Sequence, residues 1–267
     1  MLDYNDVGEP FIIPCPPPTQ AIHQVVVERV IQTMHERLCD PLILEDMADI
    51  ACLSPYYFCR VFHQIVGIPP GEFLATLRLD RAKHLLLTTS LSITDICFEV
   101  GYTGLGSFTT RFTQQVGVSP RQLRTLAREG ITTAFSRRNE MGREPAPIVH
   151  HAGVQGHIHT IDPFKGLIFA GLFRKAIPQG QPVSCTLLMA PGAYTIRNVP
   201  DGRYFLLVAA LPISENIHTY LLPQDDILVG IAGPVVVRHG TTQMPVDLVL
   251  RAPCLTDPPI ISTLPFI

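Results

Sequence analysis

The sequence predicts a multidomain α plus β protein, in which an all-α tandem helix-turn-helix domain is followed by an all-β sandwich domain. Two observations lead to this fold class. A helical hydrophobic pattern in residues 93–124 recurs about 50 positions upstream, and from residue 164 onward short apolar runs broken by proline and glycine replace it. The chain has 267 residues, of which 46% are hydrophobic, enough for two cores. The predicted boundaries are a proline-rich leader (1–19), the helical domain (20–129), a linker (130–161) and the sandwich (162–267).

The second predicted unit lies between Ile93 and Arg124. Apolar residues at 93, 96, 97 and 100 form one helical stripe, and Ser92 is the expected N-cap. Gly101 supplies the positive φ that a sharp turn between two helices needs. The next helix, 105–116, places Phe108 and Phe112 inward and leaves Gly106, Thr109, Thr110 and Thr113 outward, where a DNA major groove would meet them.

The first predicted unit repeats this design. Leu44, Met47 and Ala48 stand 49 positions before Ile93, Ile96 and Cys97, and Phe58, Phe62, Gly67 and Pro70 stand 50 positions before their counterparts. A helix over about 20–38 precedes this unit. Its second helix, 55–66, begins with Ser54 as N-cap and Pro55 at the first helical position.

These elements, together with the GY, SF, RF and GVSP motifs, resemble the AraC-type (AraC/XylS) family of bacterial transcription regulators over about residues 20–128. The resemblance implies two units joined by a long helix, with Arg60 at a base-contacting position; a solvated or phosphate-bound Arg60 is the alternative. The second unit departs from many relatives, because short or apolar groups stand where they place arginine and polar side chains. The predicted DNA-binding residues are Tyr56, Cys59, Arg60, His63, Arg78, Arg81, Leu105, Gly106, Ser107, Thr110, Arg111, Arg121 and Arg124.

The charge distribution agrees with this interpretation. The net charge is −3, but residues 111–143 hold seven arginines against two acids, and such a run would follow phosphates. Five acids between residues 36 and 50 form a solvated face or, alternatively, a contact for RNA polymerase. The seven cysteines are scattered without a CxxC pair, so reduced thiols are expected; Cys59 could instead be a redox sensor.

The linker contains four histidines that invite a metal hypothesis: His150, His151, His157 and His159. His-x-His on a strand puts both imidazoles on one face. No acid or cysteine other than Asp162 completes an obvious ligand set, so we predict no metal and no cofactor.

Seven strands are predicted after residue 164, from the segments GLIFAGLF, VSCTLLM, AYTIRNV, RYFLLVAAL, DILVGI, PVVVRH and VDLVL. Residues 193–209 are interpreted as a hairpin across a PDG turn, which resembles the carboxypeptidase regulatory-like (prealbumin-like) sandwich. That resemblance implies a fold and no chemistry.

The leading functional hypothesis is a cytoplasmic, sequence-specific DNA-binding transcription regulator that is not an enzyme. Its expected partners are double-stranded DNA, RNA polymerase, a small-molecule effector and a second copy of the chain, with no membrane, since no apolar run approaches the ~18 residues that span a bilayer. Two alternatives concern the sandwich, which could be a metal-dependent enzyme or a pure interaction module. Two independent cores are expected across the linker.

Overall fold

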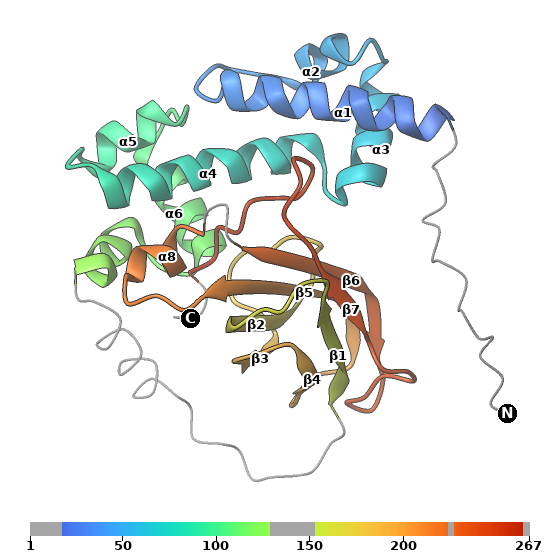
Figure 1. Ribbon diagram of the computed structural model, residues 1–267. Coiled ribbons are helices and arrows are strands. Elements are labelled where there is room, and N and C mark those ends of the chain that lie inside the picture. The colour runs from blue at the N-terminus through green and yellow to red at the C-terminus, as the bar shows by residue number, and fades with distance from the viewer. Residues whose placement is uncertain (1–17, 129–152, 224–226, 264–267) are drawn as a thin grey trace, which may run out of the picture.

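The computed structural model describes residues 18–128, 153–223 and 227–263 (Figure 1). The predicted leader (its residues 1–17), most of the predicted linker and the arginines at 137, 138 and 143 lie outside these ranges. In Figure 1 the helical part of the chain lies on one side and the two β-sheets on the other. Of the helices described, none is long and apolar enough to cross a membrane.

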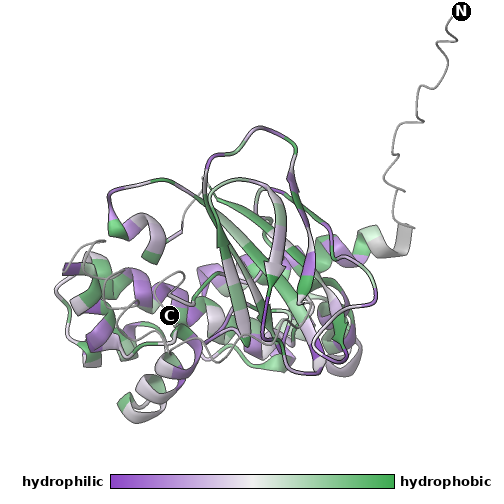
Figure 2. Cartoon of the chain, turned by 90° about the horizontal axis from the view of Figure 1, so that it is seen from below, coloured by the Kyte–Doolittle hydropathy of each residue, from purple (hydrophilic) through white to green (hydrophobic). Residues whose placement is uncertain are grey.

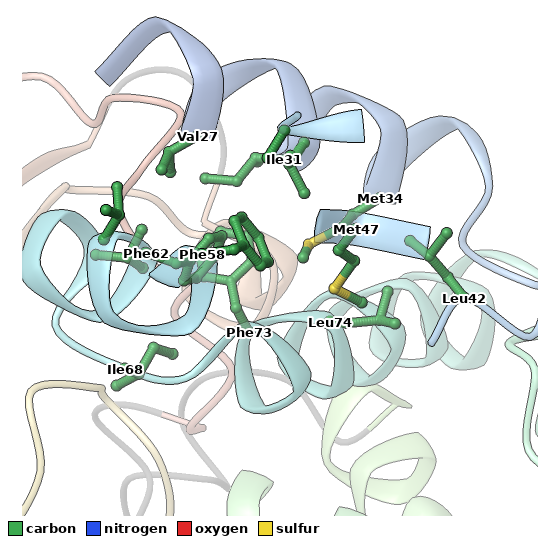
Figure 3. Packing of buried hydrophobic residues seen from close by; sticks show 14 of the residues in the cluster. Val27, Ile31, Met34, Leu42, Met47, Phe58, Phe62, Ile68, Phe73 and Leu74 are labelled. Carbon is green, nitrogen blue, oxygen red and sulfur yellow. The ribbon is translucent and has the colours of Figure 1, made fainter. Parts of the chain in front are cut away.

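The first helix-turn-helix unit consists of three helices around one buried cluster. The helices are α1 (Pro18–Glu36), α2 (Leu44–Ile50) and α3 (Pro55–Val66). Phe58 and Phe62 from α3 are fully buried and meet edge to face at 5.6 Å between ring centroids, and Phe62 meets Phe73 in the same way. Figure 3 shows the rings of Phe58 and Phe62 below Val27 and Ile31 of α1, with Phe73 beneath them and Met47 of α2 to one side. The predicted core of this unit is confirmed.

The second unit repeats the arrangement with α4 (Pro70–Thr88), α5 (Ile93–Glu99) and α6 (Leu105–Val116), and residues 120–128 are helical as well. Helix α4 serves both units, because Phe73, Leu74 and Leu77 enter the first cluster while four residues nearer its C-terminus enter the second. Phe108 and Phe112 are fully buried, as the sequence predicts.

The two units differ in the residue that forms the turn between their helices. Gly67 and Gly117 end α3 and α6 in the left-handed region, at φ 84° and 95°. In the turn between the two helices of the second unit, Gly101 has φ 80°, as predicted. The equivalent position in the first unit is Cys52, which is held at φ 54° even though it has a Cβ atom. Ser92 caps α5, since its Oγ accepts a hydrogen bond from Asp95 N at 3.1 Å.

The β part contains two sheets. Their strands are β1 (Val154–Thr160), β2 (Gly166–Phe173), β3 (Ser184–Leu188), β4 (Gly192–Ile196), β5 (Gly202–Pro212), β6 (Leu228–Val237) and β7 (Leu248–Leu250), with the short helix α8 (Ile217–Leu221) after β5. One sheet has the order β4-β1-β7 and the other β3-β2-β5-β6. Strands β1 and β7 are parallel, whereas all other pairs are antiparallel.

Three strand predictions need correction. The predicted hairpin across the PDG turn is wrong, because β4 pairs with β1 and β5 pairs with β2 and β6 in the other sheet. Residues 154–160, which the sequence places in the linker, form β1. The predicted strands DILVGI and PVVVRH are one strand, β6, whose pairing with β5 shifts register between Tyr204 and Leu206. Alternating residues and turn formers do not reveal which sheet a strand enters.

Residues from both sheets bury a common cluster. Ile158 and Ile196 come from the first sheet, and Leu172, Leu206 and Val235 come from the second. The second sheet also buries residues on its opposite face, so all eight residues of β2 are buried. The view from below shows apolar and polar residues interspersed on strands and helices (Figure 2).

The β part contributes side chains to both helical clusters. Ile177 packs into the first cluster, and Ile217, Leu221 and Ile261 pack into the second. This differs from the expectation of two independent cores. The hydrophobic periodicity of a segment predicts whether it forms a helix or a strand. It does not predict which other part of the chain packs against that helix or strand.

A fully buried lysine of α4 lies at this boundary. The Lys83 ammonium donates a hydrogen bond to the carbonyl oxygen of Ile260 at 3.2 Å. Burial lowers the pKa of Lys83 to about 8, although the nearby Asp80 carboxylate acts in the opposite direction. Burial also raises the pKa of Asp80. A charged group is therefore costly at this position. The Lys83 ammonium is stabilised there by the backbone carbonyl that accepts its hydrogen bond.

Candidate nucleic-acid interface

The outer face of α3 presents most of the side chains that the sequence selects in the first unit. Tyr56 is 83% exposed, and Arg60 and His63 are exposed on the same helix. Cys59, which the sequence also selects, is partly buried. With Phe58 and Phe62 fixed in the core, the helix has only one orientation that keeps its apolar stripe buried. The polar residues therefore project from a rigid surface.

The guanidinium group of Arg60 is supported by an aromatic ring. Its Cζ lies 4.9 Å from the centroid of the Tyr57 ring, within the range of a cation–π contact. Tyr57 in turn bonds His23 of α1, with 3.3 Å between the hydroxyl and Nε2. Sequence reasoning did not select Tyr57. The signal available was its position three residues before Arg60, which places both side chains on neighbouring helical rows.

The outer face of α6 is different in chemistry. Leu105, Gly106, Ser107, Thr110 and Arg111 are all exposed, as predicted. A Cβ atom added to Gly106 would meet nothing within 4 Å, so this part of the surface is open. The Ser107 hydroxyl donates to the carbonyl oxygen of Gly104 at 2.8 Å and is engaged within the helix N-terminus. Arg111 is the one charged side chain among these five.

Arg78 and Arg124 point toward the protein backbone. Arg78 donates from Nε to Leu38 O at 2.9 Å and from Nη2 to Asp40 O at 2.7 Å. Arg124 donates from Nε to Leu86 O at 3.1 Å, and its Nη2 also bonds Leu91 O. The two arginines occupy equivalent places. Each lies on the helix that follows a unit and binds carbonyl oxygens at or just after the C-terminal end of the first helix of that unit. Their geometry is that of a structural cap.

Two further arginines remain free for solvent or a partner. Arg81 of α4 and Arg121 of the segment 120–128 are both exposed. Of the four predicted arginines outside the recognition helices, the structure therefore engages two with backbone carbonyls and exposes two. The DNA-contacting role of all four stays a prediction.

The histidine pair of the linker prediction lies on β1. His157 and His159 are exposed on one face of the strand, with ring centroids 5.9 Å apart and nearly parallel planes. His150 and His151 lie outside the described residues. Within the part of the chain that the structure describes, no three or more His, Cys, Asp or Glu side chains gather as metal ligands would.

Comparison with known proteins matches the helical region. A family model described as "Helix-turn-helix domain" matches residues 47–125. The HTH-type transcriptional activator AarP of Providencia stuartii is 30% identical over 95 residues, which cover 36% of this chain and 70% of AarP. The bifunctional transcriptional activator/DNA repair enzyme AdaA of Bacillus subtilis is 31% identical over 102 residues, or 38% of this chain; the chain spans about half of AdaA, 48%.

A solved structure is similar to part of the chain. It is the crystal structure of a transcriptional regulator from Chromobacterium violaceum, described as an AraC-type DNA-binding domain-containing protein, with 28% identity, a TM-score of 0.38 and coverage of 39% of this chain and 94% of that one. The family match over residues 47–125 includes the two helices whose exposed faces are described above. The chain belongs to the AraC family of helix-turn-helix transcriptional regulators.

Proposed function

We propose that the chain is a transcription regulator that binds double-stranded DNA sequence-specifically, with α3 and α6 each entering a major groove. The observation that carries this proposal is the repeated unit, in which the last helix (α3 or α6) buries two phenylalanines and leaves its opposite face exposed. An α-helix fits the major groove, where each base pair presents a distinct pattern of donors and acceptors.

The two helices contribute unequally to sequence reading. Arg60 carries a free guanidinium edge above Tyr57 and can donate two parallel hydrogen bonds to guanine O6 and N7. On α6, Leu105, Gly106 and Thr110 are suited to thymine methyl groups and to close backbone approach. Arg111 serves a phosphate. Base discrimination therefore depends mainly on the first unit.

Selection of bound sequences from random DNA, repeated with Arg60→Ala, tests this assignment. Loss of a bidentate base contact costs about 1–3 kcal/mol, which is roughly a 5- to 150-fold loss of affinity for the preferred site. Arg29→Ala, an exposed arginine of α1 outside the proposed interface, is the matched control. An Arg60→Ala protein that selects the same sites with wild-type affinity contradicts the base-reading role.

For the β part we propose a carboxypeptidase regulatory-like sandwich that binds an effector or mediates dimerisation. Two sheets with a shared cluster support the fold, and the contacts of residues 177, 217, 221 and 261 with the helical clusters support an influence on DNA binding. Light scattering over a concentration series separates the two roles, because only dimerisation raises the molar mass without a ligand.

The remaining features belong to the same proposal. We expect a cytoplasmic regulator without catalytic activity, whose acidic residues on α2 offer a contact for RNA polymerase (Glu45, Asp46 and Asp49). Screening the purified chain for turnover, and measuring transcription from a selected site with these acids neutralised, test the two expectations separately.

A further inference from the structure

A partly enclosed cavity of about 60 Å³ lies between the second sheet and two loop segments. One water needs roughly 10–15 Å³ of such volume, so the cavity holds about four to six heavy atoms of a ligand. Because it is only partly enclosed, the rest of a larger ligand would extend through its open side. Its lining is mainly apolar and comes from β2, β5, β6 and the segments 176–178 and 257–260; it includes Phe173, Leu207, Ala209, Ile231, Pro258 and Ile260.

The cavity exists because a small residue stands in a row of large ones. Leu207, Ala209 and Leu211 alternate along β5 on the face that is turned away from the shared cluster of the two sheets. Ala209 is 4% exposed and lines the cavity, whereas both leucines fill their positions. A single methyl side chain at this point leaves unfilled volume against the opposite wall.

The charges at the cavity neutralise each other. Arg251 and Asp257 are its charged lining residues, and they form a two-point ion pair with Nη1–Oδ2 at 2.6 Å and Nη2–Oδ1 at 2.7 Å. Asp257 also accepts a hydrogen bond from Cys254 N at 2.8 Å. Among the described lining residues no charge is left unpaired to balance an ionic ligand, and transfer of an unpaired charge into an apolar site is costly. The lining therefore favours an uncharged molecule.

The two loop walls of the cavity are the segments that hold the helical units. In the first wall, Gly180 N donates to Gln115 O of α6, and Gln179 Nε2 donates to Thr76 Oγ1 of α4 at 2.7 Å. The preceding Lys175 pairs with Glu72 at 2.6 Å.

In the second wall, Ile260 O accepts the hydrogen bond of Lys83, and Ile261 is buried in the core of the second unit. Thr263 donates from both N and Oγ1 to Val116 O, at 3.0 and 3.1 Å. Val116 is the last residue of the recognition helix α6. Pro258 and Ile260, which a bound molecule would contact, therefore lie only five and three residues before Thr263, the residue that is hydrogen-bonded to that helix.

We propose that this cavity is an effector site for a small, uncharged, mainly apolar molecule, which acts on the second helix-turn-helix unit through residues 175–180 and 257–263. The regulatory half of this proposal rests on the proposed function, whereas the binding half does not. The ligand contacts both segments in the arrangement that is bonded to α6. Binding therefore suppresses their local opening, and the population of the docked arrangement rises.

The test uses the full chain without DNA and two probes of similar size, benzyl alcohol and the charged benzoate. Nuclear magnetic resonance titration measures binding, and amide hydrogen exchange measures the docking of the two segments. At ten times its dissociation constant, benzyl alcohol is expected to slow exchange of the Gly180 and Thr263 amides about tenfold. The Tyr102 amide, bonded to Cys97 O within the second unit, is the internal reference.

Two variants make the site assignment specific. Ala209→Leu fills the cavity and is expected to weaken benzyl alcohol binding at least tenfold, while Ala193→Leu on the exposed face of β4 leaves it unchanged. Should Ala209→Leu fail to fold, Ala209→Val provides a smaller filling. Benzoate binding as tight as that of benzyl alcohol overturns the proposal, and so does wild-type binding by a folded Ala209 variant.

A final arm separates this proposal from the proposed function. Affinity for a selected DNA site is measured with and without saturating benzyl alcohol, and a change of several-fold is expected in the wild type and not in the filled variant. A chain that binds benzyl alcohol but no DNA refutes the proposed function and leaves the cavity assignment standing. A chain that binds DNA with an affinity independent of bound benzyl alcohol refutes the effector role.

Discussion

Replacement of Lys83 by methionine is expected to change how the stability of the protein depends on pH. The pKa of this lysine is lowered from 10.5 to about 8 because its ammonium group is fully buried. Below pH 8 the group is charged in both the folded and the unfolded chain, so the full cost of its burial is present. Between pH 8 and 10.5 the unfolded chain binds more protons than the folded chain, and stability rises with pH.

The size of this effect follows from the shift itself. A shift from 10.5 to about 8 corresponds to about 3 kcal/mol, since one pKa unit equals roughly 1.4 kcal/mol. Lys83→Met keeps the length of the side chain and cannot ionise. The free energy of unfolding of the wild type, measured with urea from pH 7 to 11, should therefore gain about 3 kcal/mol relative to the variant.

A matched control is available on the same interface. Lys175 is 64% exposed and pairs with Glu72, so Lys175→Met removes a lysine that is not desolvated. Urea unfolding of Lys175→Met over the same pH range separates the effect of burying Lys83 from the effect of removing a lysine at this interface. Tyrosine and cysteine ionise in all three proteins and cancel in the differences. A difference between wild type and Lys83→Met that is flat over pH 7–11 would refute the assignment of a buried, protonated lysine.

Three further predictions concern the helical units. Gly101→Ala should lower the free energy of unfolding by at least about 1–2 kcal/mol, because φ is 80° and the new Cβ would meet Cys39 O at 3.0 Å. An unchanged melting temperature would contradict the left-handed backbone conformation at this position. Phe112→Ala should cost about 3–5 kcal/mol in urea unfolding, and a loss below 1 kcal/mol would argue against its place in the core. Arg124→Met removes the donor to the final carbonyls of α4 and should lower the free energy of unfolding by about 1–3 kcal/mol. The exposed Arg121→Met is the control and should stay within about 0.5 kcal/mol of the wild type. Equal effects of the two substitutions would rule out a capping role for Arg124.

The helical part could be predicted in detail because its signals are local. The bounds of α3 and α6 coincide with the predicted ranges 55–66 and 105–116, since proline or a turn begins each helix and glycine ends it. The inward phenylalanines follow from the spacing of four residues. The repeat adds a second, independent reading of the same pattern.

The β part could be predicted only as a set of strands. The segment GLIFAGLF is β2, and its unbroken apolar run is consistent with burial on both faces. Nothing in the sequence indicates that β4 lies in the other sheet. Strand β1 is not predicted as part of the sheet because glycine at an inward position weakens its apolar alternation. Pairing partners are set by contacts between residues far apart in the chain.

For the candidate interface, the sequence predicts where each arginine lies along a helix, but it does not predict which way its side chain points. The sequence places Arg78 and Arg124 on helices next to a recognition unit, where a phosphate contact is a reasonable expectation. A long side chain can reach several acceptors from one Cα, and in the structure these guanidinium groups reach backbone carbonyls. Arg60 instead lies over the Tyr57 ring on the exposed face of α3, and its base-contacting role stays a prediction.

The double membership of α4 makes this helix a spacer that fixes the phase of the two units. The first half of α4 packs in one cluster and its second half in the other, and the helix is continuous between them. One residue inserted near its middle would turn the second unit by about 100° and advance it by about 1.5 Å relative to the first. If both units bind DNA as proposed, two rigid units on such a spacer would accept only targets whose half-sites lie at one distance and one angle around the duplex. The length of a single helix would then be a specificity determinant.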